Sequence, residues 1–442
     1  MNLPVRASCE KRGDHSDTIH HRHWTERQHR HHAAAATAVR LRQAAVKITA
    51  DYFSPGIRMG LATAAALETA GLLGSAHVGV YLSPGPTARV LKRIAGPRVA
   101  NRIVNDIPAA RIRSHPQLTI ATQVRRRLLL SGQDTTPVDQ KLSRMFSSIA
   151  RRCGSSAVIG IQSCCVEMFR GREYRVMEQV SPPLRYERAI AHEELAAFPG
   201  WAPEGVTKSS DWDLRMEAEW QAADLVWVPS PHLIDISRQF GADPRKFEVV
   251  PYPIPWPLPV APKEKVTTRG RLRVLFAGTL MLEKGVQYIY EALRSRPDLP
   301  VLMEFFGPSQ LTPFGLRCLS EVGTVRGAVP RSQLLEEFRQ ADILLFPSLS
   351  EGSALVTLEA AALGLPVVTT KEAGAPASVL TIPARSPQAI IDAIESLADD
   401  PARLDQLSSG GLAEAASRNS AVYVGRVVNS FSELTGTHPG DA

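Results

Sequence analysis

The sequence lacks any apolar run that approaches the roughly 20 residues needed to cross a lipid bilayer. It also has no secretory signal with a clean hydrophobic core, so we expect neither a membrane span nor secretion. Cysteine is scarce, and the five residues are Cys9, Cys153, Cys164, Cys165 and Cys318. Their odd number and their spacing suit neither a disulfide framework nor a zinc site. We therefore expect a reducing, cytoplasmic location.

Several catalytic signatures are missing as well. The chain has no Walker-type glycine-rich loop, no nicotinamide-binding fingerprint and no Ser-His-Asp arrangement at a recognisable elbow. These absences argue against P-loop nucleotide hydrolysis, hydride transfer and serine hydrolase chemistry.

The 442 residues, of which 44% are hydrophobic, suggest two large globular domains. Residues 1–44 differ from the rest, because seven histidines crowd an arginine-rich stretch, namely His15, His20, His21, His23, His29, His31 and His32. Metal binding is one interpretation of this composition. We favour a disordered extension without a catalytic role.

Two carboxylates stand out in the C-terminal half, Glu351 and Glu359. Glu351 follows the apolar strand predicted at 342–347, and Glu359 falls inside the helix that begins after it. Eight helical residues rise about 12 Å, roughly the span from a sugar hydroxyl to the ribose of a nucleotide sugar. Free N–H groups near Leu355 and Val356 would face the diphosphate between them, because a helix N-terminus favours negative charge.

The surrounding sequence shows the same pattern of a strand followed by a helix. Residues 273–278 predict a buried strand that ends at Gly278, which permits close backbone approach, and Lys284 follows as a point charge for phosphate. Further strands are predicted at 301–306, 322–327, 343–346 and 366–369, each alternating with a helical pattern. This alternation predicts a doubly wound parallel sheet with ligands at the carboxyl ends of its strands.

These residues resemble the nucleotide-sugar domain of glycosyltransferase family 4, which has the GT-B fold and retains anomeric configuration. The matching signatures are Gly278 with Lys284-Gly285, Val329-Pro330 with Ala341-Asp342-Ile343, Pro347-Ser348 with Glu351-Gly352, Glu359-Ala360 in the Glu-x7-Glu pattern, and Gly364-Leu365-Pro366-Val367-Val368. The resemblance extends from about residue 225 to about residue 429 and is weak before that.

The resemblance implies a retaining glycosyltransferase that moves a sugar from a UDP- or GDP-linked donor to a glycan or lipid-linked acceptor, in surface polysaccharide or glycolipid synthesis. It implies that Glu351 contacts the donor sugar, that Glu359 binds the ribose and that Lys284 helps neutralise the diphosphate, with Glu351 and Lys284 as the catalytic pair. The implied donor-binding set is Gly278, Thr279, Lys284, Glu351, Gly352, Ser353, Ala354, Leu355, Val356 and Glu359. No Asp-x-Asp in a magnesium-binding context is present, so we expect neither a metal nor a cofactor.

Two departures from the family pattern bear on the donor. Thr279 stands where the family often has an arginine, and Ser353-Ala354 replaces the usual Phe-Gly. Alanine disfavours positive φ, so the loop is expected to differ in shape. Two alternatives also remain open at this point: a catalytically silent nucleotide-sugar-binding protein and, as a weaker possibility, a nucleotide-sugar epimerase.

The N-terminal half supplies candidates for the cleft that faces the donor. A strand at 46–53 precedes Gly56 and Arg58, a strand at 156–161 precedes Ser163, and a strand at 224–229 precedes Ser230. Arg58 is either a substitute for the missing phosphate contact or a solvent-facing side chain. No family-like cleft histidine is found after the strand at 156–161, and His192 is interpreted as a surface residue.

Residues 86–130 are strongly basic, with apolar residues interleaved among the arginines. An anionic membrane surface and a solvated helix face both explain such a pattern. No recognisable nucleic-acid-binding module accompanies it, so no nucleic-acid partner is expected.

The chain therefore divides into five predicted parts. They are an extension at 1–44, an acceptor-binding Rossmann-like domain at 45–254, a proline-rich linker at 255–270, a nucleotide-sugar-binding Rossmann-like domain at 271–420 and a C-terminal helix with a tail at 421–442, the helix packing back on the first domain.

Overall fold

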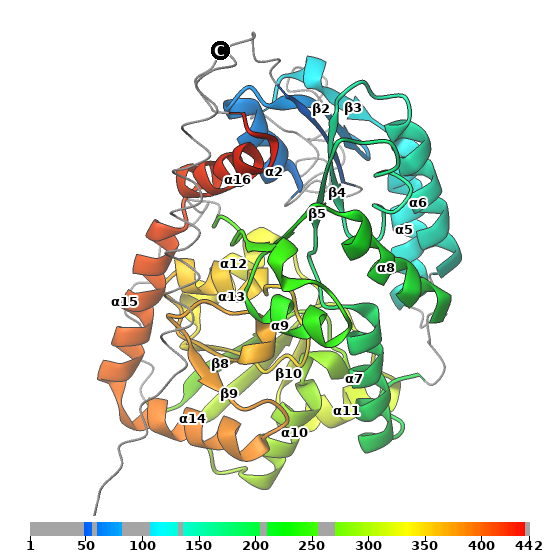
Figure 1. Ribbon diagram of the computed structural model, residues 1–442. Coiled ribbons are helices and arrows are strands. Elements are labelled where there is room, and N and C mark those ends of the chain that lie inside the picture. Colours follow the sequence, from blue (N-terminus) through cyan, green and yellow to red (C-terminus); the bar gives the residue numbers. More distant parts are fainter. Residues whose placement is uncertain are drawn as a thin grey trace, which may run out of the picture. The chain divides into compact units, whose positions relative to one another are not determined.

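The computed structural model describes residues 48–54, 60–81, 107–130, 136–203, 210–254 and 270–437. Two parallel β-sheets organise these residues (Figure 1). The first has the strand order β3-β2-β1-β4-β5-β6-β7, and the second has the order β10-β9-β8-β11-β12-β13. In both sheets the order reverses beside the first strand, which is the arrangement of a doubly wound α/β domain. The predicted fold class is confirmed.

The strands of the first sheet are β1 (Ala50–Phe53), β2 (Leu73–Val78), β3 (Ile112–Ser114), β4 (Ala157–Ile161), β5 (Tyr174–Glu178), β6 (Leu225–Val228) and β7 (Phe247–Val249). Those of the second are β8 (Leu272–Ala277), β9 (Val301–Phe306), β10 (Thr324–Gly327), β11 (Ile343–Phe346), β12 (Val367–Thr370) and β13 (Leu380–Ile382). Helices cover both faces of the central strands, and every residue of β1, β11 and β12 is buried, including the polar residues Asp51, Thr369 and Thr370.

Helices connect most successive strands, whereas β4 and β5 are joined by turns. Those associated with the first sheet are α2 (Gly60–Thr69), α5 (Pro116–Leu130), α6 (Thr136–Ala150), α7 (Leu184–Ala197), α8 (Ser210–Ala222) and α9 (His232–Gln239). The later ones are α10 (Val286–Ser295), α11 (Pro313–Val322), α12 (Arg331–Gln340), α13 (Leu355–Ala362), α14 (Pro387–Asp399), α15 (Pro401–Ser417) and α16 (Ser420–Thr435), with the single turn η3 (Leu282–Lys284). No described helix combines the length and apolar character required to span a bilayer.

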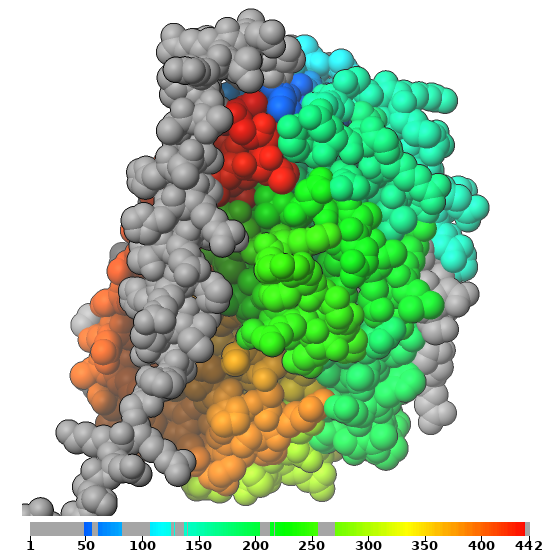
Figure 2. Space-filling view, in the orientation of Figure 1, coloured from blue at the N-terminus to red at the C-terminus, as the bar shows by residue number. Residues whose placement is uncertain are grey.

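The last helix returns to the first sheet. Tyr423, Val427 and Phe431 of α16 are buried in the same core as Ala50 and Leu67. Figure 2 shows α16, in red, bordering blue residues from the N-terminal part of the first domain.

Helix α7, which follows the first-sheet strand β5, packs against α10 in the domain of the second sheet. Its buried Glu194 accepts hydrogen bonds from Gln287 Nε2 (2.7 Å) and the Tyr288 hydroxyl (2.7 Å) on α10. Arg385 Nε, 2.6 Å away, supplies the opposite charge. Because a buried carboxylate is stable only when it is paired and hydrogen-bonded, these contacts fix α7 against the second sheet.

Candidate functional site

The glycine-containing turn after β8 positions Lys284. Gly285 closes η3 with φ of +73°, and a Cβ atom there would lie 2.0 Å from the carbonyl oxygen of Pro347. Only glycine tolerates both the left-handed backbone and this close approach. The turn consequently packs against the loop after β11, where the N–H of Leu349 donates to the Glu283 carbonyl at 2.8 Å.

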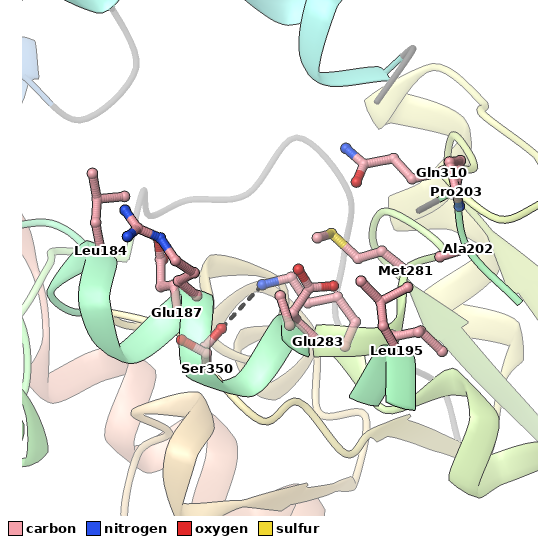
Figure 3. Close-up of a pocket in the computed structure, with 13 residues that line it drawn as sticks. Leu184, Glu187, Leu195, Ala202, Pro203, Met281, Glu283, Gln310 and Ser350 are labelled. Carbon is pink, nitrogen blue, oxygen red and sulfur yellow. Dashed lines mark hydrogen bonds between the residues drawn. The ribbon is translucent and has the colours of Figure 1, made fainter. Parts of the chain in front are cut away.

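Lys284 and Glu351 converge at this contact. The Nζ atom of Lys284 lies 2.7 Å from Oε1 of Glu351 and 3.1 Å from the carbonyl oxygen of Ser350, the bond drawn dashed in Figure 3. Both side chains are mostly buried, with 19% and 23% of their surfaces exposed. An ammonium group has three donors, so two are used and one N–H remains for a ligand.

Helix α13 begins later than the sequence predicts. Its first residue is Leu355, so Glu351 lies in a loop and the predicted 12 Å of continuous helix between the two carboxylates is wrong. The loop is held because the Glu351 N–H donates to the Glu372 carbonyl and the Ala354 N–H to the Ala373 carbonyl, both at 3.0 Å. Because these N–H groups bond to carbonyls outside the helix, the first helical turn begins only at Leu355.

The start of α13 presents polar groups that have no partner in the part of the chain that the structure describes. No residue described in the structure accepts a hydrogen bond from the N–H of Leu355 or Val356. The buried hydroxyls of Ser350 and Ser353 also have no hydrogen-bond partner among the described residues. Ala354 has φ of −69°, and neither Ser353 nor Ala354 is among the described residues with positive φ, so this Ser-Ala pair is compatible with the loop. Unpartnered donors at a helix start favour an anion.

Glu359 lies within α13 and is 7% exposed. Its Oε1 atom accepts from Nε (3.2 Å) and Nη2 (3.0 Å) of Arg331, the first residue of α12. Sequence reasoning missed Arg331, although its place directly after the Val329-Pro330 signature was a usable signal.

The first sheet contributes Ser230 and His232 to the same loop. The Ser230 hydroxyl donates to the Gly352 carbonyl, and His232 Nε2 lies 2.7 Å from the Glu351 carbonyl oxygen. Burial lowers the pKa of His232, and because a carbonyl oxygen can only accept, the Nε2–H of this ring is the donor in that contact. A Cβ atom at Gly352 would lie 1.9 Å from the Val180 carbonyl oxygen. Both sheets therefore position the peptide between Glu351 and Gly352.

The structure places the remaining predicted residues in different surroundings, and some of them lie outside the described residues. Gly278 packs tightly, since a Cβ atom there would lie 3.2 Å from the Phe346 ring, and Thr279 follows it half-buried. Ser163 follows β4, and its N–H donates to Glu219 Oε2 at 2.8 Å. Gly56 and Arg58 lie outside the described residues, as do 1–44 and the linker up to 269. His192, as expected, is exposed on α7.

A cavity of about 350 Å³ adjoins Lys284. One wall is α7, and the other is the turn after β8 together with Gln310 and Ser350 (Figure 3). Arg188 and Glu187 lie on the α7 wall, and Glu283, whose pKa is raised by burial, lies opposite. Arg188 is also paired with Asp213 at 2.7 Å. The cavity is therefore apolar in part, with charged groups at its wall.

Part of the chain is similar to a known sequence family. Residues 271–400 match the family described as Glycosyl transferases group 1. The D-inositol 3-phosphate glycosyltransferase of Segniliparus rotundus is 31% identical over 205 residues, covering 41% of this chain and 45% of the relative. That of Arthrobacter sp. (strain FB24) is 35% identical over 150 residues, covering 30% and 36%. The chain thus matches less than half the length of either relative.

Solved structures extend the similarity over most of the fold. Sucrose-phosphate synthase from Thermosynechococcus elongatus aligns with a TM-score of 0.58 and 15% identity, covering 89% of this chain and 96% of that one. Anabaena HepE in complex with UDP-glucose aligns with a TM-score of 0.54 and 14% identity, covering 87% and 100%. Identities this low establish the fold alone. The chain has the GT-B fold, with two Rossmann-like domains.

Proposed function

We propose that this protein is a retaining glycosyltransferase that moves a sugar from a nucleoside diphosphate sugar, UDP- or GDP-linked, to a glycan or lipid-linked acceptor. The observation that carries the proposal is the convergence of Lys284 and Glu351, 2.7 Å apart, beside the unpartnered N–H groups that begin α13. The match of 271–400 to Glycosyl transferases group 1 supports the same reaction class.

The diphosphate is assigned to the start of α13. Lys284 has one N–H left after its bonds to Glu351 and Ser350, and the Leu355 and Val356 N–H groups add fixed dipoles. The Ser350 and Ser353 hydroxyls, buried without described partners, are further donors for phosphate oxygens. These groups stabilise the charge that develops on the leaving diphosphate without having to reorganise.

The sugar and the ribose are assigned to the two carboxylates. Glu351 is oriented by Lys284 and accepts a sugar hydroxyl, while Glu359 accepts the ribose hydroxyls. Arg331 holds the Glu359 carboxylate in place, so it acts as a positioning residue.

The acceptor hydroxyl attacks on the face from which the diphosphate departs, which preserves the anomeric configuration. The departing phosphate takes the hydroxyl proton, so the reaction needs no separate general base. We propose a metal-independent reaction, because lysine and helix dipoles supply the positive charge that a metal would otherwise provide.

A membrane-associated acceptor is part of the proposal. Helix α5 exposes Ile120 (66%) and Val124 (43%) immediately before the basic run 125–127. Apolar side chains beside arginines suit the anionic inner face of a cytoplasmic membrane and a role in polysaccharide or glycolipid synthesis. Most of the basic region, 86–106, lies outside the described residues.

The test is incubation of the purified protein with radiolabelled UDP- and GDP-sugars. Slow release of free sugar from one donor is the expected result, because glycosyltransferases hydrolyse their donors when the acceptor is absent. Saturable binding without turnover would instead identify a silent binding protein, and inversion at C2 would identify an epimerase. Either outcome contradicts the proposal.

A further inference from the structure

A polar cluster lies in the first sheet and shares no residue with the proposed donor site. It consists of Asp51 on β1, Ser75 and His77 on β2, His115 after β3, and Cys153 in the turn before β4, and we call it the Asp51 cluster. Asp51 is paired in register with Ser75, and Phe53 with His77, so these side chains share one face of the sheet. Phe53 stacks on the His77 ring at 4.5 Å and meets Phe146 of α6 edge-on, which places the cluster beneath that helix.

We propose that Asp51, His77 and Cys153 form a binding site for a divalent transition metal, with Zn²⁺ as the best match. One ligand atom from each residue lies within 4.8 Å of the other two. Oxygen, nitrogen and sulfur donors together are the set that Zn²⁺ accepts, and this donor set is too soft for Mg²⁺ or Ca²⁺.

The ligand atoms of His77 and Cys153 lie close to the separation that zinc requires. His77 Nε2 and Cys153 Sγ are 3.2 Å apart. Tetrahedral zinc, with bonds of about 2.3 Å to sulfur and about 2.0 Å to nitrogen, separates such atoms by about 3.5 Å. A displacement of a few tenths of an ångström therefore brings this pair to the zinc separation, and the Asp51 ligand atom lies within 4.8 Å of both. Cys153 is half-buried and gives the ion a route from solvent.

A second observation points to a ligand. Asp51 is 3% exposed, and its Oδ2 atom has no hydrogen-bond partner among the described residues. The other oxygen, Oδ1, accepts from the Ser75 hydroxyl at 2.5 Å. A buried carboxylate oxygen without a partner is costly, and a cation removes that cost.

The groups around the ligands also suit a metal. His77 Nδ1 lies 3.0 Å from His115 Nε2, and His77 Nε2 lies 2.8 Å from the Ser75 hydroxyl oxygen. Metal binding through Nε2 requires the tautomer in which Nδ1–H donates to His115 and Nε2 exchanges its Ser75 contact for the ion. Metal-bound histidines usually donate their second ring N–H in this way. Arg172 fixes the turn that carries the thiol by donating to the carbonyls of Cys153 (3.2 Å) and Ser155 (2.6 Å).

The charges of the ligands would balance that of the bound ion. The Cys153 thiol releases its proton to solvent as the sulfur–metal bond forms, and the thiolate with the Asp51 carboxylate matches the two positive charges of the ion. Water takes the fourth tetrahedral position. The ion would join β1, β2 and the turn before β4, which share no residue with the proposed donor site.

The test is a Co²⁺ titration of the full chain carrying Cys9→Ser, because residue 9 adjoins the histidine-rich segment and would confuse a thiol signal. A thiolate-to-cobalt absorption band that saturates at one equivalent is expected. The band should persist in a further Cys318→Ser variant, which removes a buried cysteine of the second sheet, and disappear with Cys153→Ser or His77→Gln. His115→Phe should weaken the apparent affinity about 10- to 100-fold.

Absence of the band in the Cys9→Ser protein, or its persistence after Cys153→Ser, would overturn the proposal. Should Cys153→Ser fail to fold, X-ray absorption at the zinc edge of the Cys9→Ser protein, loaded with one equivalent, decides the question. One sulfur in the coordination shell supports the site, and a shell of nitrogen and oxygen alone refutes it.

Discussion

The Nε2 atom of His232, in the first sheet's domain, lies 2.7 Å from the carbonyl oxygen of Glu351, in the second. Ser230 makes a parallel bond to the Gly352 carbonyl, so two neighbouring peptides of the proposed sugar-binding loop are held from the opposite domain. The orientation of the Glu351 side chain therefore depends on the first sheet, although no first-sheet residue needs to touch the donor.

This relationship predicts the effect of His232→Ala. Loss of one buried hydrogen bond costs about 1 kcal/mol, so donor affinity should fall several-fold to about 10-fold. Calorimetric titration with the donor identified by the hydrolysis screen measures the change. His192→Ala, on the exposed side of α7, is the control and should bind normally. Equal affinities for the two variants would show that His232 does not support the loop.

Arg331→Ala should destabilise the fold, because it leaves the buried Glu359 charge without this partner. The arginine is 36% exposed, so solvent screening reduces the loss to about 1–2 kcal/mol. Urea unfolding of Arg331→Ala, Glu359→Gln and the double variant checks this prediction. The double variant should be more stable than Arg331→Ala alone, and a strictly additive result would contradict the pairing.

Gly352→Ala should disrupt the contact between the domains. The new methyl would lie 1.9 Å from the Val180 carbonyl oxygen, so the loop must move, at a cost of about 1–3 kcal/mol. Gly425→Ala is the matched control, since nothing lies within 4 Å of its Cβ position on α16. Thermal unfolding compares the two. A Gly352→Ala protein as stable as the control would contradict the described packing.

Stability should fall as pH rises from about 4.5 to about 7, because of Glu219. Burial raises the pKa of this carboxyl to about 7, although the N–H groups of Cys165 and Ser163 partly stabilise its charge. Between those pH values the folded protein retains a proton that the unfolded chain releases, so raising the pH favours unfolding. The loss is on the order of 3 kcal/mol and is complete above pH 7.

Unfolding free energies measured from pH 4.5 to 8 should show this slope in the unmodified protein and a flatter profile in Glu219→Gln. An unchanged slope in the variant would assign the pH dependence to another group.

The sequence predicted the second sheet well because local signals agreed there. The buried run 343–346 and the Gly278-to-Lys284 turn coincide with β11 and with the end of β8 and η3. The start of α13 was misplaced for a physical reason: Glu351 and Ala354 donate their N–H groups to carbonyls at 372–373, and sequence-local patterns carry no information about such partners.

Sequence patterns also missed contacts between segments that lie far apart in the chain, because these patterns describe only neighbouring residues. His232 follows Ser230 by two residues, yet its partner is 119 positions away in the sequence. The Asp51 cluster was likewise invisible in the cysteine spacing, because its three candidate ligands come from three separate segments. Parallel sheets bring such segments together only after folding.

The measurement that tests the central claim most directly is donor turnover by Lys284→Ala beside Lys141→Ala. Lys284 contacts Glu351 in the loop before α13, whereas Lys141 is exposed on α6. Removal of one positioned donor to a developing negative charge typically costs 100- to 1,000-fold in rate, roughly 3–4 kcal/mol. We predict a loss of that size for Lys284→Ala and normal turnover for Lys141→Ala. Normal turnover by a folded Lys284→Ala protein would contradict the account.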